Sequence, residues 1–187
     1  SSFLMGSMTF SIQLIKRDFE LTRVVASLHN IGLALSLVVI SIALLRGGHH
    51  RPAHHTIRFG WSLLISGSIL YCLSPSIYFS IPSVLVFAAG SVIAGNTSTA
   101  ILGSHSKTAL NNMFRTTGVG LFVGALAPTL IGLTTQVEIP WRLTMATTAA
   151  VIGAIALFLI PDLEARPEPE DKLGKIVWDK PILYIFF

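Results

Sequence analysis

Residues 59–104 contain no Asp, Glu, Lys or Arg, and no other feature of this sequence limits the possible folds as strongly. Similar charge-free apolar stretches cover residues 24–45, 116–137 and 143–161. A helix of about 20 apolar residues is needed to cross the roughly 30 Å hydrocarbon core of a bilayer, whereas a soluble domain does not need so much uncharged surface. The pattern therefore predicts a protein embedded in a membrane.

Composition and backbone chemistry narrow the fold class further. Hydrophobic residues make up 52% of the chain and charged residues only 12%, which is typical of membrane proteins. A backbone in lipid must satisfy its own hydrogen bonds, so it forms helices or a closed barrel. Because the apolar stretches are long and continuous, without the strict alternation of barrel strands, we expect an all-α polytopic membrane protein.

The cysteine count and the net charge exclude two other classes. The single Cys72 rules out a disulfide framework and is expected to be a buried thiol. The formal charge of +4 does not predict a nucleic-acid partner, because the lysines and arginines fall in the expected loops, where they set membrane topology.

The apolar stretches predict a bundle over residues 1–160 with six helices, at about residues 2–15, 21–45, 57–73, 83–104, 108–135 and 141–160. We expect a polar hinge at residues 46–56, and a turn at residues 74–82 because Pro75 and Pro82 bracket it.

The composition of the two ends predicts a piece of a longer chain. Residues 161–181 are rich in Pro, Glu, Asp and Lys, as a solvated cytoplasmic linker would be, and a seventh helix is expected to start at residue 182. The first apolar stretch is too short to cross unaided and lacks the basic region of a signal peptide. We therefore expect a truncated first helix within a longer polytopic protein.

Basic residues are distributed unequally between alternate loops, with Arg115 counted as lying inside a span. One set contains Arg46, Arg51, Arg58, Lys107, Arg166, Lys172, Lys175 and Lys180, and the other contains Lys16, Arg17, Arg23 and Arg142. The larger set is expected in the cytoplasm. This predicts a multi-pass protein of the cell membrane, or of the inner membrane if the source is bacterial.

Three motifs resemble the major facilitator superfamily. The loop at residues 46–55 contains Gly47 and several basic residues, as the loop between the second and third helices does in that family. The expected fifth helix is similar to the Gly-Pro-rich fifth helix of the antiporter branch, with Gly118, Gly120, Gly124, Pro128 and Gly132, although Ala127 precedes the proline. The entry to the sixth helix, Pro140-Trp141-Arg142, is also similar.

The resemblance implies the N-terminal six-helix half of a transporter, built from two inverted three-helix repeats. It implies alternating-access transport of a small molecule, with proton-coupled efflux as the expected subtype. The implied partners are the lipid bilayer, the substrate and a C-terminal half of the same protein. We expect no enzymatic activity, no catalytic residue, no cofactor and no bound metal.

Polar residues inside the spans are the candidate site residues, because each is costly in lipid and should face protein or water. The predicted substrate cavity contains His29, Asn96, Thr97, Asn111 and Arg115. Two alternatives stay open: His29 forms a hydrogen bond between helices, and the Arg115 side chain extends back to the cytoplasmic headgroups.

Small residues and proline form a stripe along the fifth helix. Gly120, Gly124, Pro128 and Gly132 recur at every fourth position, so they share one helix face. Such a stripe allows another helix to approach closely, either for packing alone or as a pivot for alternating access.

Two rival functions follow from the same sequence. Imidazoles bind iron and zinc, so the cluster of histidines at residues 49–55 suggests a membrane-embedded metal enzyme. The other rival is a membrane subunit that does not transport.

Overall fold

A computed structural model describes residues 2–47, 53–104 and 109–159 of the chain. Six helices occupy these ranges: α1 (Ser2–Asp18), α2 (Arg23–Gly47), α3 (Ala53–Cys72), α4 (Ile77–Ser104), α5 (Ala109–Gln136) and α6 (Trp141–Leu159). The described part of the chain contains no β-strand, which confirms the all-helical prediction. The predicted linker at residues 161–181 and the predicted helix from residue 182 lie outside it.

Within these ranges, four helices are long and apolar enough to cross a membrane, namely α2, α4, α5 and α6. The other two are α1, which has 17 residues, and α3, whose first turn is polar and contains His54, His55 and Thr56. That turn corrects the predicted boundary, because α3 begins at Ala53 and not at residue 57. The four apolar helices indicate a membrane protein.

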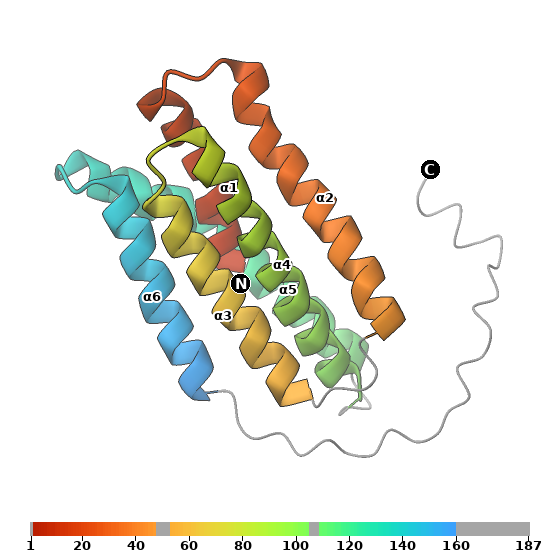
Figure 1. The fold of residues 1–187 in the computed structure, drawn as a ribbon. Helices are drawn as coiled ribbons and strands as arrows, with labels where there is room; N and C mark the ends of the chain where they lie inside the picture. The colour runs from red at the N-terminus through yellow and green to blue at the C-terminus, as the bar shows by residue number, and fades with distance from the viewer. Residues whose placement is uncertain (1, 48–52, 105–108, 160–187) are drawn as a thin grey trace.

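Figure 1 shows α6, α3, α4 and α2 side by side in that order, with α1 and α5 behind them. The contacts between helices agree with this view: α3 packs most extensively against α4, while α6 packs on α3 and α2 packs on α4. Behind this layer, α1 packs against α5. The described helices thus form one bundle of two layers.

The first helix lies inside the bundle and has one polar, exposed face. Its apolar residues recur at helical spacing, and Leu4, Met8, Ile12 and Ile15 are all buried. On the opposite face, Thr9, Gln13 and Arg17 are exposed.

Glycines allow α3 and α4 to pack almost backbone to backbone. A Cβ added to Gly60 would lie 2.6 Å from the backbone nitrogen of Ala94, far inside van der Waals contact. A Cβ on Gly67 would collide with the backbone of Phe87, and one on Gly90 would collide with the backbone around Leu64. No larger side chain fits at these positions without separating the two helices.

The turn predicted at residues 74–82 is longer than the observed one, because α4 begins at Ile77 and not at residue 83. The carbonyl of Ser76 accepts a hydrogen bond from the amide of Phe79 at 3.1 Å, so the helix is already established before Pro82. Pro82 is the sixth residue of α4, where proline removes one backbone hydrogen bond and can bend the helix, but α4 continues through it. The remaining predicted helix ends lie within three residues of the observed ones.

Candidate functional site

Two predicted cavity residues lie at the same end of neighbouring helices. Asn96 is exposed on α4, eight residues before the helix ends, and Arg115 is exposed on α5, six residues after that helix begins. At 1.5 Å per residue these positions are about 12 Å and 9 Å from the ends of their helices. The two positions therefore lie at a similar depth in the bundle, on two helices that contact each other.

The other two predicted residues of this group are less informative. Thr97 follows Asn96 on α4 and is half-buried. Asn111 belongs to the first turn of α5, but its side chain lies outside the described part of the structure. The polar surface at this end therefore rests on Asn96 and Arg115.

His29 is buried and forms a hydrogen bond between two helices, which is the alternative to its predicted place in the substrate cavity. Its Nδ1 lies 3.1 Å from the carbonyl oxygen of Ala26, and its Nε2 lies 2.8 Å from the Ser80 hydroxyl on α4. A carbonyl only accepts, so Nδ1 donates to Ala26, and the other ring nitrogen makes the hydrogen bond to Ser80. This bond joins α2 to α4.

The structure does not bring His29 together with Asn96 and Arg115. Its partner Ser80 and Asn96 are 16 residues apart on α4, which corresponds to about 24 Å along the helix. His29 belongs instead to a polar region at the opposite end of the bundle, where α1, α3 and α5 end.

The centre of that region is Arg142, at the start of α6. One carboxylate oxygen of Asp18 lies 3.3 Å from a guanidinium nitrogen of Arg142 and accepts a hydrogen bond from the indole nitrogen of Trp141 at 3.0 Å. Arg142 also donates to the backbone carbonyls of Ser74 at 2.9 Å and of Cys72 at 3.5 Å. These contacts join the end of α1, the end of α3 and the start of α6, and we call them the Asp18–Arg142 clamp.

Tyr71 connects the clamp to His29. Its ring is buried, with its centre 6.1 Å from that of His29 and 6.2 Å from that of Trp141. The Tyr71 hydroxyl makes no hydrogen bond within the described residues. Side chains from α1, α2, α3, α4 and α6 thus meet at one end of the bundle.

Sequence reasoning missed this clamp. Asp18 follows the first predicted span and Trp141-Arg142 begins the sixth, but nothing in the sequence pairs positions more than 120 residues apart. The one available signal was the position of Asp18 at the end of an apolar stretch, where a carboxylate needs a nearby cation or water.

The predicted stripe on α5 meets α1 over only part of its length. Gly6 packs against the backbone of Gly124, and a Cβ on Gly124 would lie 2.9 Å from the backbone oxygen of Ser2. A Cβ on Gly120 would lie 2.6 Å from the hydroxyl of Ser2. By contrast, a Cβ on Gly132 would meet no described atom within 4 Å. Close helix approach therefore involves the first half of the stripe, while Pro128 is half-buried.

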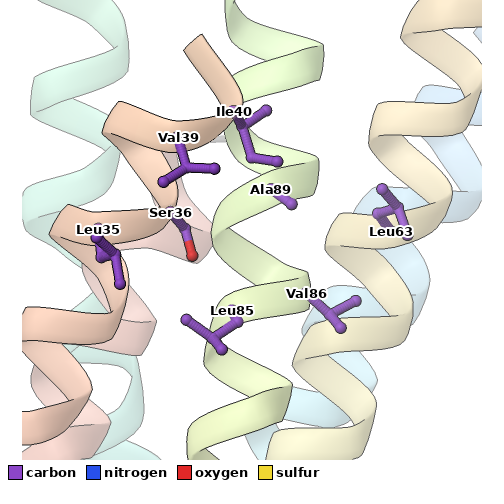
Figure 2. A pocket seen from close by; sticks show the side chains of 8 residues that line it. All are labelled: Leu35, Ser36, Val39, Ile40, Leu63, Leu85, Val86 and Ala89. Carbon is purple, nitrogen blue, oxygen red and sulfur yellow. The ribbon is translucent and has the colours of Figure 1, made fainter. Parts of the chain in front are cut away.

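One cavity lies between α2, α3 and α4 and is apolar. It has a volume of about 390 Å³, and Figure 2 shows the side chains of Leu35, Ser36, Val39, Ile40, Leu63, Leu85, Val86 and Ala89 around it. The only polar group among them is the Ser36 hydroxyl, so this lining suits hydrocarbon and not a charged substrate. None of the predicted site residues lines it.

The histidine loop of the metal-enzyme alternative is only partly described. His49 and His50 lie outside the described residues, and the rings of His54 and His55 stack at 4.0 Å between centres. Among the residues that the structure does describe, no three His, Cys, Asp or Glu side chains gather in a way that would bind a metal ion.

Comparison with known proteins finds no match to this chain, whether among protein families, curated proteins or solved structures.

Proposed function

We propose that the six helices form one half of a secondary transporter of the major facilitator type, which moves a small molecule across the membrane by alternating access. The observation that carries the proposal is the pair of exposed polar side chains, Asn96 and Arg115, on the adjacent apolar helices α4 and α5. Polar groups at such depth are costly in lipid, so they are expected to face a water-filled cavity or another part of the protein.

The pattern of helix contacts supports two inverted three-helix repeats. If α1, α2 and α3 correspond to α4, α5 and α6, then the contact of α1 with α5 corresponds to that of α4 with α2. The contact of α1 with α2 likewise corresponds to that of α4 with α5, and α3 meets its own counterpart, α6. Repeats with an odd number of helices are inverted in the membrane, which is the arrangement found in many transporters. The α3–α4 contact is much more extensive than its counterpart between α1 and α6.

The two ends of the bundle suit different roles in this mechanism. The Asp18–Arg142 clamp ties several helices together at one end, so the half moves as a rigid body there. At the other end, Asn96 and Arg115 form a polar wall of the pathway. A second six-helix half of the same protein forms the opposite wall of the pathway. The substrate is a small molecule that occupies the space between the two halves.

Arg115 is the residue to which we assign the main substrate contact. Its guanidinium carries a permanent charge and a planar set of donors, which suits an anionic substrate group or a carboxylate of the second half. All nine Asp and Glu residues of this sequence lie outside the predicted spans. In proton-coupled efflux, the proton is therefore carried by an acidic residue of the second half.

Inverted membrane vesicles that contain the complete gene product test this proposal. The vesicles are acidified inside by respiration, and the recovery of a ΔpH-sensitive dye is followed as compounds from a panel are added. Compounds that are exchanged for protons should collapse the gradient. We expect Arg115→Ala to reduce this response by about 10- to 100-fold at normal protein abundance, because one hydrogen-bonded charge contributes about 1.5–3 kcal/mol.

Two further variants complete the comparison. Arg115→Lys should give an intermediate rate, because an ammonium keeps the charge but loses the bidentate geometry. Arg17→Ala removes an exposed arginine on α1 and should leave the rate unchanged. A full response from Arg115→Ala would contradict the assignment and indicate that the Arg115 side chain extends to the headgroups instead.

A further inference from the structure

A second hollow, separate from the apolar cavity and the proposed pathway wall, lies between the end of α1 and the start of α2. It has a volume of about 370 Å³, and five polar side chains line it: Gln13, Lys16, Arg23, Ser27 and Asn30. Its remaining lining comes from Ile12 and Ala26. Sequence reasoning assigned Lys16 and Arg23 only to membrane topology, and it gave no role to Gln13 or Ser27.

The charge of this hollow is positive and uncompensated within the described residues. Lys16 and Arg23 both line it, and no carboxylate does. Of the two acidic residues between Lys16 and Arg23, Asp18 is already held by Arg142 and Trp141 of α6, and Glu20 does not line the hollow. No ion pair between described residues involves Lys16 or Arg23.

Backbone geometry adds to this positive charge. Helix α2 begins at Arg23, and the hydroxyl of Thr22 accepts a hydrogen bond from the amide of Val25 at 3.3 Å. The positive end of the α2 dipole therefore lies at the hollow, where it favours an anion.

The remaining polar groups extend the hollow along the helices. Asn30 lies seven residues into α2, and Gln13 lies five residues before the end of α1. These positions are about 10 Å and 8 Å from the helix ends. Their side-chain amides donate hydrogen bonds but carry no charge. A ligand would thus place its charged group between Lys16 and Arg23 and its neutral polar part beside the two amides.

We propose that this hollow binds an oxyanion group, either phosphate or carboxylate. Arg23 offers a planar pair of donors that matches two oxygens of such a group, and Lys16 offers a compact second charge. The anion belongs either to a lipid headgroup at the membrane surface or to a free solute. This binding does not depend on the proposed transport activity.

Thermal unfolding tests the proposal on the purified protein in nanodiscs of neutral phosphatidylcholine. Cys72 is the single cysteine and is buried, so a thiol-reactive dye reports unfolding directly. The two probes are sn-glycerol 1-phosphate in solution, against sodium chloride of equal ionic strength, and phosphatidylglycerol added to the nanodisc. At saturation we expect a rise in Tm of about 2–4 °C.

The variant Lys16→Gln/Arg23→Gln should lose this rise, whereas Arg17→Gln should keep it, because Arg17 is a neighbouring exposed arginine that does not line the hollow. If the double variant does not fold, Arg23→Gln alone provides the same comparison with one charge removed. A rise with phosphatidylglycerol only would assign the anion to a lipid headgroup, and a rise with glycerol phosphate would assign it to a solute. The proposal is wrong if neither probe raises Tm, if the charge-neutralised variant keeps the rise, or if Arg17→Gln loses it equally.

Discussion

Arg142 joins three helices because its guanidinium has enough donors to reach several acceptors at once. It contacts the carboxylate of Asp18 and the backbone carbonyls of Cys72 and Ser74, and it lies 5.2 Å from the ring centre of Phe19. The two carbonyls belong to the last residue of α3 and to the turn after it, where no further helical amide reaches them. Arg142 therefore satisfies the end of one helix while it pairs with the end of another.

This role predicts that Arg142→Met lowers the stability of the bundle. Methionine keeps much of the apolar contact but leaves Asp18 and two carbonyls without their donor. Because the pair is partly exposed, we expect a loss of about 1–2 kcal/mol, or a few degrees in Tm. The measurement is dye labelling of Cys72 during heating. Arg17→Met serves as the control and should leave Tm unchanged, and an equal effect of both variants would show that the clamp does not stabilise the fold.

At the scale of single helices, the glycines of α4 provide a matched pair. A Cβ on Gly90 would collide with the backbone of α3, whereas a Cβ on Gly95 would meet no described atom within 4 Å. Gly90→Ala should therefore destabilise the protein by about 1–3 kcal/mol, because α3 and α4 must separate. Gly95→Ala should be neutral or slightly stabilising, since alanine is the better helix former. The measurement is the Tm of each variant, and a similar change in both would contradict the close packing of α3 against α4.

Helix existence was predictable from the sequence, but helix pairing was not. Runs of apolar residues located all six helices, and only the starts of α3 and α4 were placed several residues too late. Glycine spacing predicted a close helix contact along α5, yet Gly60, Gly67 and Gly90 allow the extensive close approach between α3 and α4. A glycine in a sequence shows that a helix allows close approach, but the partner depends on the packing of the whole bundle.

At the scale of the whole molecule, the two ends of the bundle differ in how their polar groups are used. Where α1 and α3 end, Asp18, His29 and Arg142 have partners within the bundle. Where α4 ends and α5 begins, Asn96 and Arg115 are exposed. The sequence predicted His29, Asn96 and Arg115 alike as polar residues inside spans, but it could not separate the one with a partner from those facing outward. That distinction depends on contacts between distant segments.

Cysteine accessibility in the complete gene product tests the proposed water-filled pathway most directly. Asn96 lies eight residues before the end of α4, and Val151 lies eight residues before the end of α6, so the two positions share one depth and both are exposed. In a background from which Cys72 and every other native cysteine have been removed, a membrane-impermeant thiol reagent applied to inverted vesicles should label Asn96→Cys at least about tenfold faster than Val151→Cys, because water reaches a pathway wall but not a lipid-facing surface. Equally slow labelling at both positions would contradict the account, since Asn96 would then face lipid or protein and not an aqueous pathway.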